Sequence, residues 1–184
     1  MDQNMKKQIL SALLASAGLM MVASAAHAAD GTITINGAIL QSTCKINGGT
    51  TGDVTVNLPK LRSTALPSVG SVGGRTPFTL ALSDCGTTGG KVGVYFEPGA
   101  NVDASSGRLT LDAAADTAKG VQINVLNDKQ QQIKVGSAGD QNSQLVDIAA
   151  DGTATLNYFA EYYASDAVTA GTANSKVQYS LVYQ

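Results

Sequence analysis

The chain has 184 residues, with 12 basic and 14 acidic side chains, two cysteines, one histidine and no tryptophan. Its formal net charge of −2 argues against a nucleic-acid binder, which needs a basic face, and against a binder of anionic membranes. The length allows one domain.

The first 28 residues are typical of a secretory signal peptide. Lys6 and Lys7 precede an uncharged run from Ile9 to Val22, and Ala26-His27-Ala28 places small residues three and one before a cut. The uncharged run is too short for a spanning helix, and no later segment is long and apolar enough, so no membrane insertion of the mature chain is predicted. We predict that the signal peptide is cleaved after Ala28; cleavage after Ala26 is the alternative. The remaining 156 residues have 10 basic and 13 acidic side chains, a net charge of −3, and no histidine.

The stretch from Gly31 to Ile39 alternates between two kinds of residue. Gly31, Ile33, Ile35 and Gly37 share one face with Ile39, while small and polar residues occupy the other. A period of two predicts an extended strand with one apolar face, about 30 Å long. Such a strand either pairs inside its own domain or is an arm offered to another chain, and this stretch alone leaves both interpretations open.

Eight later segments are predicted as short strands bounded by turn residues. They are residues 53–58, 78–82, 91–96, 108–111, 121–125, 132–135, 155–163 and 176–184. Residues 60–77 are rich in glycine, proline and hydroxyl side chains and predict a loop or irregular edge. Residues 113–119 favour one helical turn at most, and Asn127-Asp128-Lys129 favours a hairpin turn.

The two closing strands each carry one apolar and aromatic face. The inward positions are Leu156, Tyr158, Ala160 and Tyr162 in one strand and Val177, Tyr179, Leu181 and Tyr183 in the other. Short strands at regular spacing, without alternating helix patterns, predict an all-β sandwich.

The sequence contains one predicted disulfide and no predicted reactive site. Cys44 and Cys85 predict a disulfide in an oxidising compartment, closing a loop of about 40 residues worth roughly 4 kcal/mol. The alternative, a metal or redox pair, fits no known spacing. Without histidine a Ser-His-Asp or Cys-His arrangement is excluded, and the aspartates lie in predicted turns. We therefore predict no catalytic residue, no metal, no cofactor and no enzyme activity, but a binding or structural module.

Several motifs in order resemble the pilus (fimbrial) subunits of the chaperone–usher pathway, closest to the type 1 fimbrial major subunits. The resemblance covers residues 29–184. It rests on the Gly-bearing arm 31–37 followed by Cys44, the partner cysteine in Leu82-Ser-Asp-Cys85, Gly120-Val-Gln-Ile123, Tyr158-Phe-Ala-Glu-Tyr162, Gly171, and Tyr183 as the penultimate residue.

The resemblance implies an incomplete immunoglobulin-like β-sandwich that lacks its last strand and is completed by a donor strand from a neighbouring chain. It divides the chain into a signal peptide (1–28), a donor-strand arm (29–37) and a pilin domain (38–184). Gly31, Ile33 and Ile35 would enter a neighbour's groove, Gly31 at a shallow pocket where exchange begins, and Gly37 would be the hinge. The acceptor groove and chaperone contact would comprise Gly171, Val177, Tyr179, Leu181, Tyr183 and Gln184.

The resemblance also implies partners and a location. The partners would be identical or related pilus subunits, a periplasmic chaperone and an outer-membrane usher, with export through the periplasm to a surface fimbria that supports adhesion. A minor adaptor subunit shares the arm and the groove and remains an alternative, as does an adhesive binding module of the same pilus. A self-complete domain that pairs its own N-terminal strand is a third hypothesis.

Overall fold

The computed structural model describes residues 33–35, 44–47, 52–86 and 89–184. The chain divides into two units, residues 1–38 and 39–184. The signal peptide, Gly31 and Gly37 lie outside the described residues.

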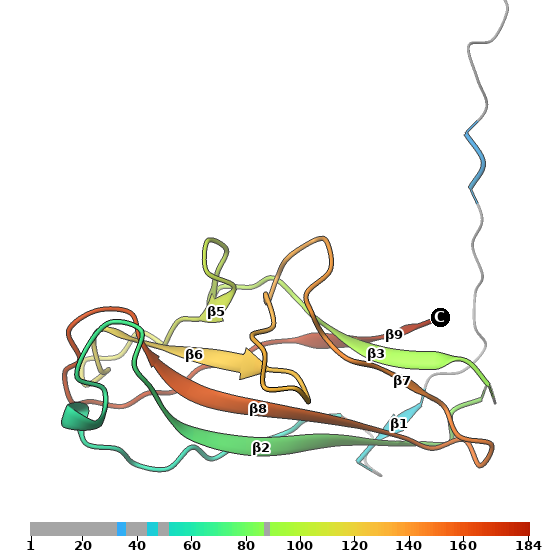
Figure 1. The fold of residues 1–184 in the computed structure, drawn as a ribbon, viewed down its shortest axis with the longest axis horizontal. Coiled ribbons are helices and arrows are strands. Elements are labelled where there is room, and N and C mark those ends of the chain that lie inside the picture. Colours follow the sequence, from blue (N-terminus) through green and yellow to red (C-terminus); the bar gives the residue numbers. More distant parts are fainter. Residues whose placement is uncertain (1–32, 36–43, 48–51, 87–88) are drawn as a thin grey trace, which may run out of the picture. The chain divides into compact units, whose positions relative to one another are not determined.

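The regular secondary structure of the second unit is almost all antiparallel strand (Figure 1). In chain order its elements are β1 (Lys45–Ile46), the 3-10 helix η1 (Ser63–Ala65), β2 (Val72–Ser83), β3 (Lys91–Phe96), β4 (Val102–Asp103), β5 (Arg108–Leu109), β6 (Val121–Leu126), β7 (Leu145–Asp147), β8 (Ala154–Ala164) and β9 (Tyr179–Tyr183). One sheet has the order β1-β2-β8-β6-β5-β4 and the other β7-β3-β9. The predicted all-β, two-sheet class is confirmed.

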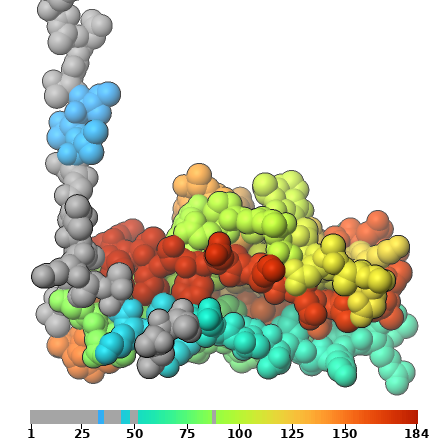
Figure 2. All heavy atoms as spheres, turned by 180° about the vertical axis from the view of Figure 1, so that it is seen from behind, coloured from blue at the N-terminus to red at the C-terminus, as the bar shows by residue number. Residues whose placement is uncertain are grey.

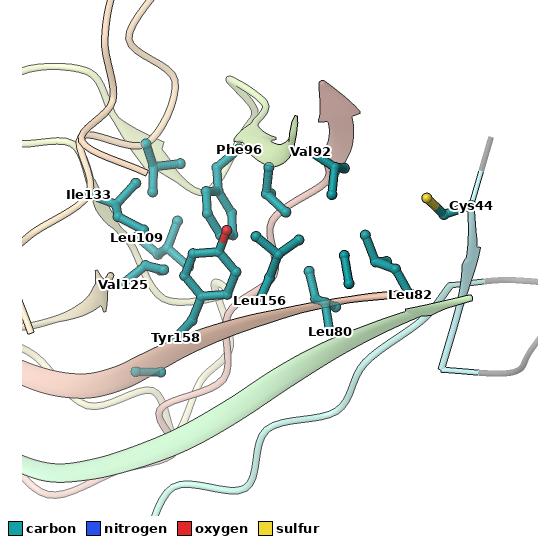
Figure 3. Packing of buried hydrophobic residues seen from close by; sticks show 14 of the residues in the cluster. Cys44, Leu80, Leu82, Val92, Phe96, Leu109, Val125, Ile133, Leu156 and Tyr158 are labelled. Atoms are coloured by element: carbon teal, nitrogen blue, oxygen red, sulfur yellow. The ribbon is translucent and has the colours of Figure 1, made fainter. Parts of the chain in front are cut away.

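The core fills the space between the two sheets and centres on Tyr158 of β8 (Figure 3). Its ring stacks on Phe78, 5.5 Å between centroids, and meets Phe96 edge-on at 5.4 Å. Burial raises the pKa of the Tyr158 phenol to about 12. Leu156, Tyr158 and Ala160 are all buried, as the alternation in this strand predicts.

Four predicted elements differ from the structure, and the first three are as follows. β2 begins at Val72, inside the expected loop, because its pairing with β8 shifts register between Gly73 and Thr76 and then resumes. Residues 113–119 form no helix; instead Thr117 bridges Thr172 in parallel. Residues 132–135 form no strand beyond one bridge to Leu126, although the predicted turn at residue 127 is present.

The segment 53–58 keeps the predicted alternation but is not a strand. Val54, Val56 and Leu58 are half-buried and pack against the core, while the residues between them are exposed. On the face shown in Figure 2, this segment (teal) lies along the C-terminal segment (red). The two segments flank the candidate site.

Candidate functional site

An open groove of about 950 Å³ runs between residues 53–62 and residues 168–179. Its floor is the sandwich core itself, including Phe78, Leu80, Phe96, Ile123, Val125 and Ala160. Charged side chains occur only toward the rim, among them Asp53, Lys60, Arg62 and Lys176. A long channel with an apolar floor is suited to binding an apolar chain segment.

The first wall of the groove, residues 53–61, is an edge without a strand partner. Within the described part of the chain, none of these residues makes a backbone–backbone hydrogen bond. The wall is held by the side chains of Val54, Val56 and Leu58, which point toward the core. Its peptide groups are therefore available to an added strand.

The second wall, residues 168–179, continues into the outer edge of β9, which pairs with β3 on one side only. Lys91 and Gln184 exchange two backbone hydrogen bonds of 2.8 and 2.9 Å, and Glu97 donates to the Gln178 carbonyl. In an antiparallel ladder these pairs alternate, so Tyr179, Leu181 and Tyr183 direct their peptide groups away from β3. This edge also remains unpaired by any described strand.

Two tyrosine hydroxyls connect the walls at the end of the groove near the disulfide. Tyr179 donates to the Gly52 carbonyl, and the Cys44 amide donates to Tyr183 Oη at 3.0 Å. Burial, and secondarily Asp53, raise the pKa of Tyr179. Both contacts fix β9 against the segment that begins the domain.

Gly171 allows a close backbone approach at the other end of the groove. A Cβ atom there would lie 2.3 Å from the Ala118 nitrogen and 2.5 Å from the Asp116 carbonyl oxygen. Only a residue without a side chain fits beside residues 116–118, which bridge Thr172.

Replacing Gly171 with Ala is expected to destabilise the domain by about 3 kcal/mol or more, because backbone must move to admit the methyl group. Gly139→Ala is the matched control, since a Cβ at Gly139 has no atom within 4 Å. Denaturant midpoints of both variants check the prediction, and equal midpoints would contradict it.

The structure brings some of the predicted site residues together. Gly171, Val177 and Tyr179 line the cavity. Leu181 and Tyr183 are half-buried against the core beyond its end, and Gln184 pairs with Lys91. The sequence does not indicate that Val54, Val56 and Leu58 belong to the site, although their alternation predicts the inward face that forms its first wall.

Ile33 and Ile35 are the predicted donor residues that the structure describes. They are 90% and 88% exposed. Both apolar side chains of the predicted strand face are therefore open to solvent in the described chain.

The predicted disulfide joins Cys44 and Cys85, confirming that pairing. Glu161 lies outside the groove with its side chain 3% exposed, and it accepts hydrogen bonds from Arg75 Nε at 2.8 Å and Asn124 Nδ2 at 3.1 Å. These fixed partners give Glu161 a structural role.

Comparisons with known proteins agree with this architecture. The sequence model of the family "Type-1 fimbrial protein, A" matches residues 58–184. The major fimbrial subunit SMF-1 of Stenotrophomonas maltophilia is 44% identical, covering 86% of this chain and 95% of its own. The F17 fimbrial protein of Escherichia coli is 41% identical, covering 97% and 99%.

A solved chaperone–usher pilus structure has the same fold, with a TM-score of 0.59 at 24% identity, covering 85% of this chain and 96% of the other. The chain belongs to the type-1 fimbrial protein family. Like these fimbrial relatives, it is a structural subunit of a surface fimbria. It is not an enzyme. No helix in the described ranges has the length and apolar character needed to cross a membrane.

Proposed function

We propose that this subunit polymerises by donor-strand exchange, in which the arm of one copy fills the groove of the next. The observation that carries the proposal is an apolar channel between residues 53–61 and residues 168–179, with two backbone edges, 53–61 and the outer side of β9, that have no partner strand among the described residues. An added strand between them would satisfy both edges and cover the core. This is β-strand addition, of which donor-strand complementation between pilins and their chaperones is an established example.

The arm comprises residues 29–37, with Gly31, Ile33 and Ile35 directed into the groove and Gly37 as the hinge. Nine extended residues reach about 30 Å, and the free wall from Asp53 to Leu61 has the same number of residues. Burying two isoleucines that are otherwise about nine-tenths exposed would contribute roughly 1.5–3 kcal/mol each. Backbone hydrogen bonds between the arm and the two edges would add to this burial free energy.

A free groove leaves wall side chains such as Val56, Leu58 and Val177 only half-buried, so the subunit needs protection before assembly. A periplasmic chaperone strand fills the groove along Val177, Tyr179, Leu181 and Tyr183, with the Gln184 carboxylate held by basic chaperone residues. An outer-membrane usher then exchanges it for the next arm. Residues 1–28 direct export and are removed.

Deleting residues 29–36 tests the proposal. The shortened subunit retains its groove but has no strand to donate, so on its own it should form no fibres. Expressed with the wild-type chain, it should accept an arm at a fibre terminus and shorten the fibres in proportion to its share. Electron microscopy of surface fibres measures both effects, and normal polymerisation of the shortened subunit would falsify donor-strand exchange.

A further inference from the structure

β2 contains a bulge where it passes the first wall of the groove. The pairing of β2 with β8 shifts register between Gly73 and Thr76. Two residues of β2, Gly74 and Arg75, therefore lie opposite one residue of β8, Glu161, and these two residues are here called the β2 bulge. Gly74 has a φ of +69°, the left-handed conformation that glycine adopts most readily. A bulge of this kind bends its strand and redirects the side chains around it.

The 59–61 end of the first wall packs on this part of β2. A Cβ atom at Gly74 would lie 3.3 Å from Pro59 Cγ, and one at Gly73 would lie 2.9 Å from Leu61 Cδ1. Pro59 and Leu61 are otherwise exposed. Because the wall makes no backbone–backbone hydrogen bond within the described chain, its position at this end depends on side-chain contacts such as these.

Arg75 fixes the β2 bulge from the opposite face of the sheet. Its Nε donates to Glu161 Oε2 at 2.8 Å, and its Nη1 donates to Gln130 Oε1. Glu161 follows Ala160, which lines the groove, so the alternation of β8 directs the Glu161 side chain to the other face. There Glu161 also accepts a hydrogen bond from Asn124 Nδ2 at 3.1 Å. Breaking this ion pair would leave a carboxylate that is 3% exposed without its opposite charge, so the pair holds the bulge in one conformation.

We propose that Arg75 is a positioning residue for acceptance of the arm. Paired with Glu161, it holds the β2 bulge, and through the contact of Gly74 with Pro59 it holds the 59–61 end of the first wall at the spacing that an incoming strand needs. The inference rests on the proposed donor-strand exchange. An added strand pairs with an edge only at a separation of about 4.8 Å, so a wall that shifts loses its pairing with the arm. Arg75 itself is not among the residues that line the groove.

The test compares fibres of the full-length wild-type and Arg75→Ala chains. The variant fibres should dissociate in denaturant about tenfold faster, because the first wall loses its fixed position. Thr79→Ala is the matched control: Thr79 Oγ1 donates to Asn157 Oδ1 at 2.9 Å across the same two strands, away from the bulge, and its fibres should dissociate at close to the wild-type rate. If Arg75→Ala yields little folded subunit, the Arg75→Ala, Glu161→Gln chain replaces it, since that chain leaves no buried charge unpaired.

A double-mutant cycle with Pro59 separates positioning from a general loss of stability. Pro59→Ala removes the wall side of the contact with Gly74 and should itself accelerate dissociation. If Arg75 acts through that contact, fibres of the Arg75→Ala, Pro59→Ala chain should dissociate no faster than Arg75→Ala fibres. Accelerations that multiply in the double variant would overturn the positioning role. Pro59→Ala without effect, or an equal acceleration by Thr79→Ala, would overturn it as well.

A synthetic peptide of residues 29–37 tests donor-strand exchange separately. Added in excess during assembly, it should stop the growth of wild-type fibres by filling their grooves. A peptide without effect would overturn donor-strand exchange, and the role of Arg75 with it. An effective peptide together with accelerations that multiply would overturn the role of Arg75 alone.

Discussion

Fibre assembly is expected to fall below detection when Ile33 and Ile35 are both replaced by Asp. In the proposed complex both side chains enter an apolar channel floored by residues such as Phe78 and Ile123. The double change removes roughly 3–6 kcal/mol of apolar burial and places two carboxylates where no charged partner lines the floor. An ionised group buried without a partner is more costly still.

The expected loss is specific to donation, because these side chains are about nine-tenths exposed in the subunit itself. The double variant should therefore fold, oxidise its disulfide and accept an arm from a wild-type copy. Sedimentation of surface-sheared material measures the fibres, and incorporation of the variant at fibre ends in mixed expression measures acceptance.

Thr34→Asp is the matched control for this pair. Thr34 lies between the two isoleucines and, by the alternation of a strand, points away from the groove. The Thr34→Asp change introduces one such charge into the same arm, on the face that points away from the groove, so its fibres should form in near-normal amounts. If Thr34→Asp blocked assembly as strongly as the isoleucine changes, the arm would not enter with the proposed face.

The sequence predicts which faces are buried better than it predicts which strands pair. The alternation of Val54, Val56 and Leu58 correctly indicates one inward face. An alternation with a period of two indicates which side chains are buried, but it does not indicate which backbone groups are hydrogen-bonded. It therefore does not predict that this segment has no described partner strand. That missing partner is what makes the segment a wall of the groove.

Contacts between distant parts of the chain account for the other differences. The bond between Cys44 and Tyr183 joins residues 139 positions apart, and the close approach at Gly171 depends on residues 116–118. Neither leaves a local pattern. β2 begins early because a register shift lets a glycine-rich stretch rejoin the sheet, where composition alone indicates a loop.

Replacing both cysteines with alanine is expected to lower the free energy of unfolding by about 2–5 kcal/mol. The disulfide closes the segment between Cys44 and Cys85, which contains β1, the wall 53–61, η1 and β2. Because that wall makes no backbone hydrogen bonds within the described chain, its position depends on three half-buried side chains and on this closure. Loss of the disulfide should therefore loosen the wall first, and hydrogen exchange should accelerate more in residues 53–61 than in β8.

The Cys44→Ala, Cys85→Ala chain should unfold at a lower denaturant midpoint and be recovered from cells in smaller amounts. Reductant should shift the wild-type midpoint toward that of the double variant and leave the variant unaffected, which separates the disulfide from the change in side chains. Identical midpoints for the wild-type and variant chains would show that the groove wall is held by its side chains alone.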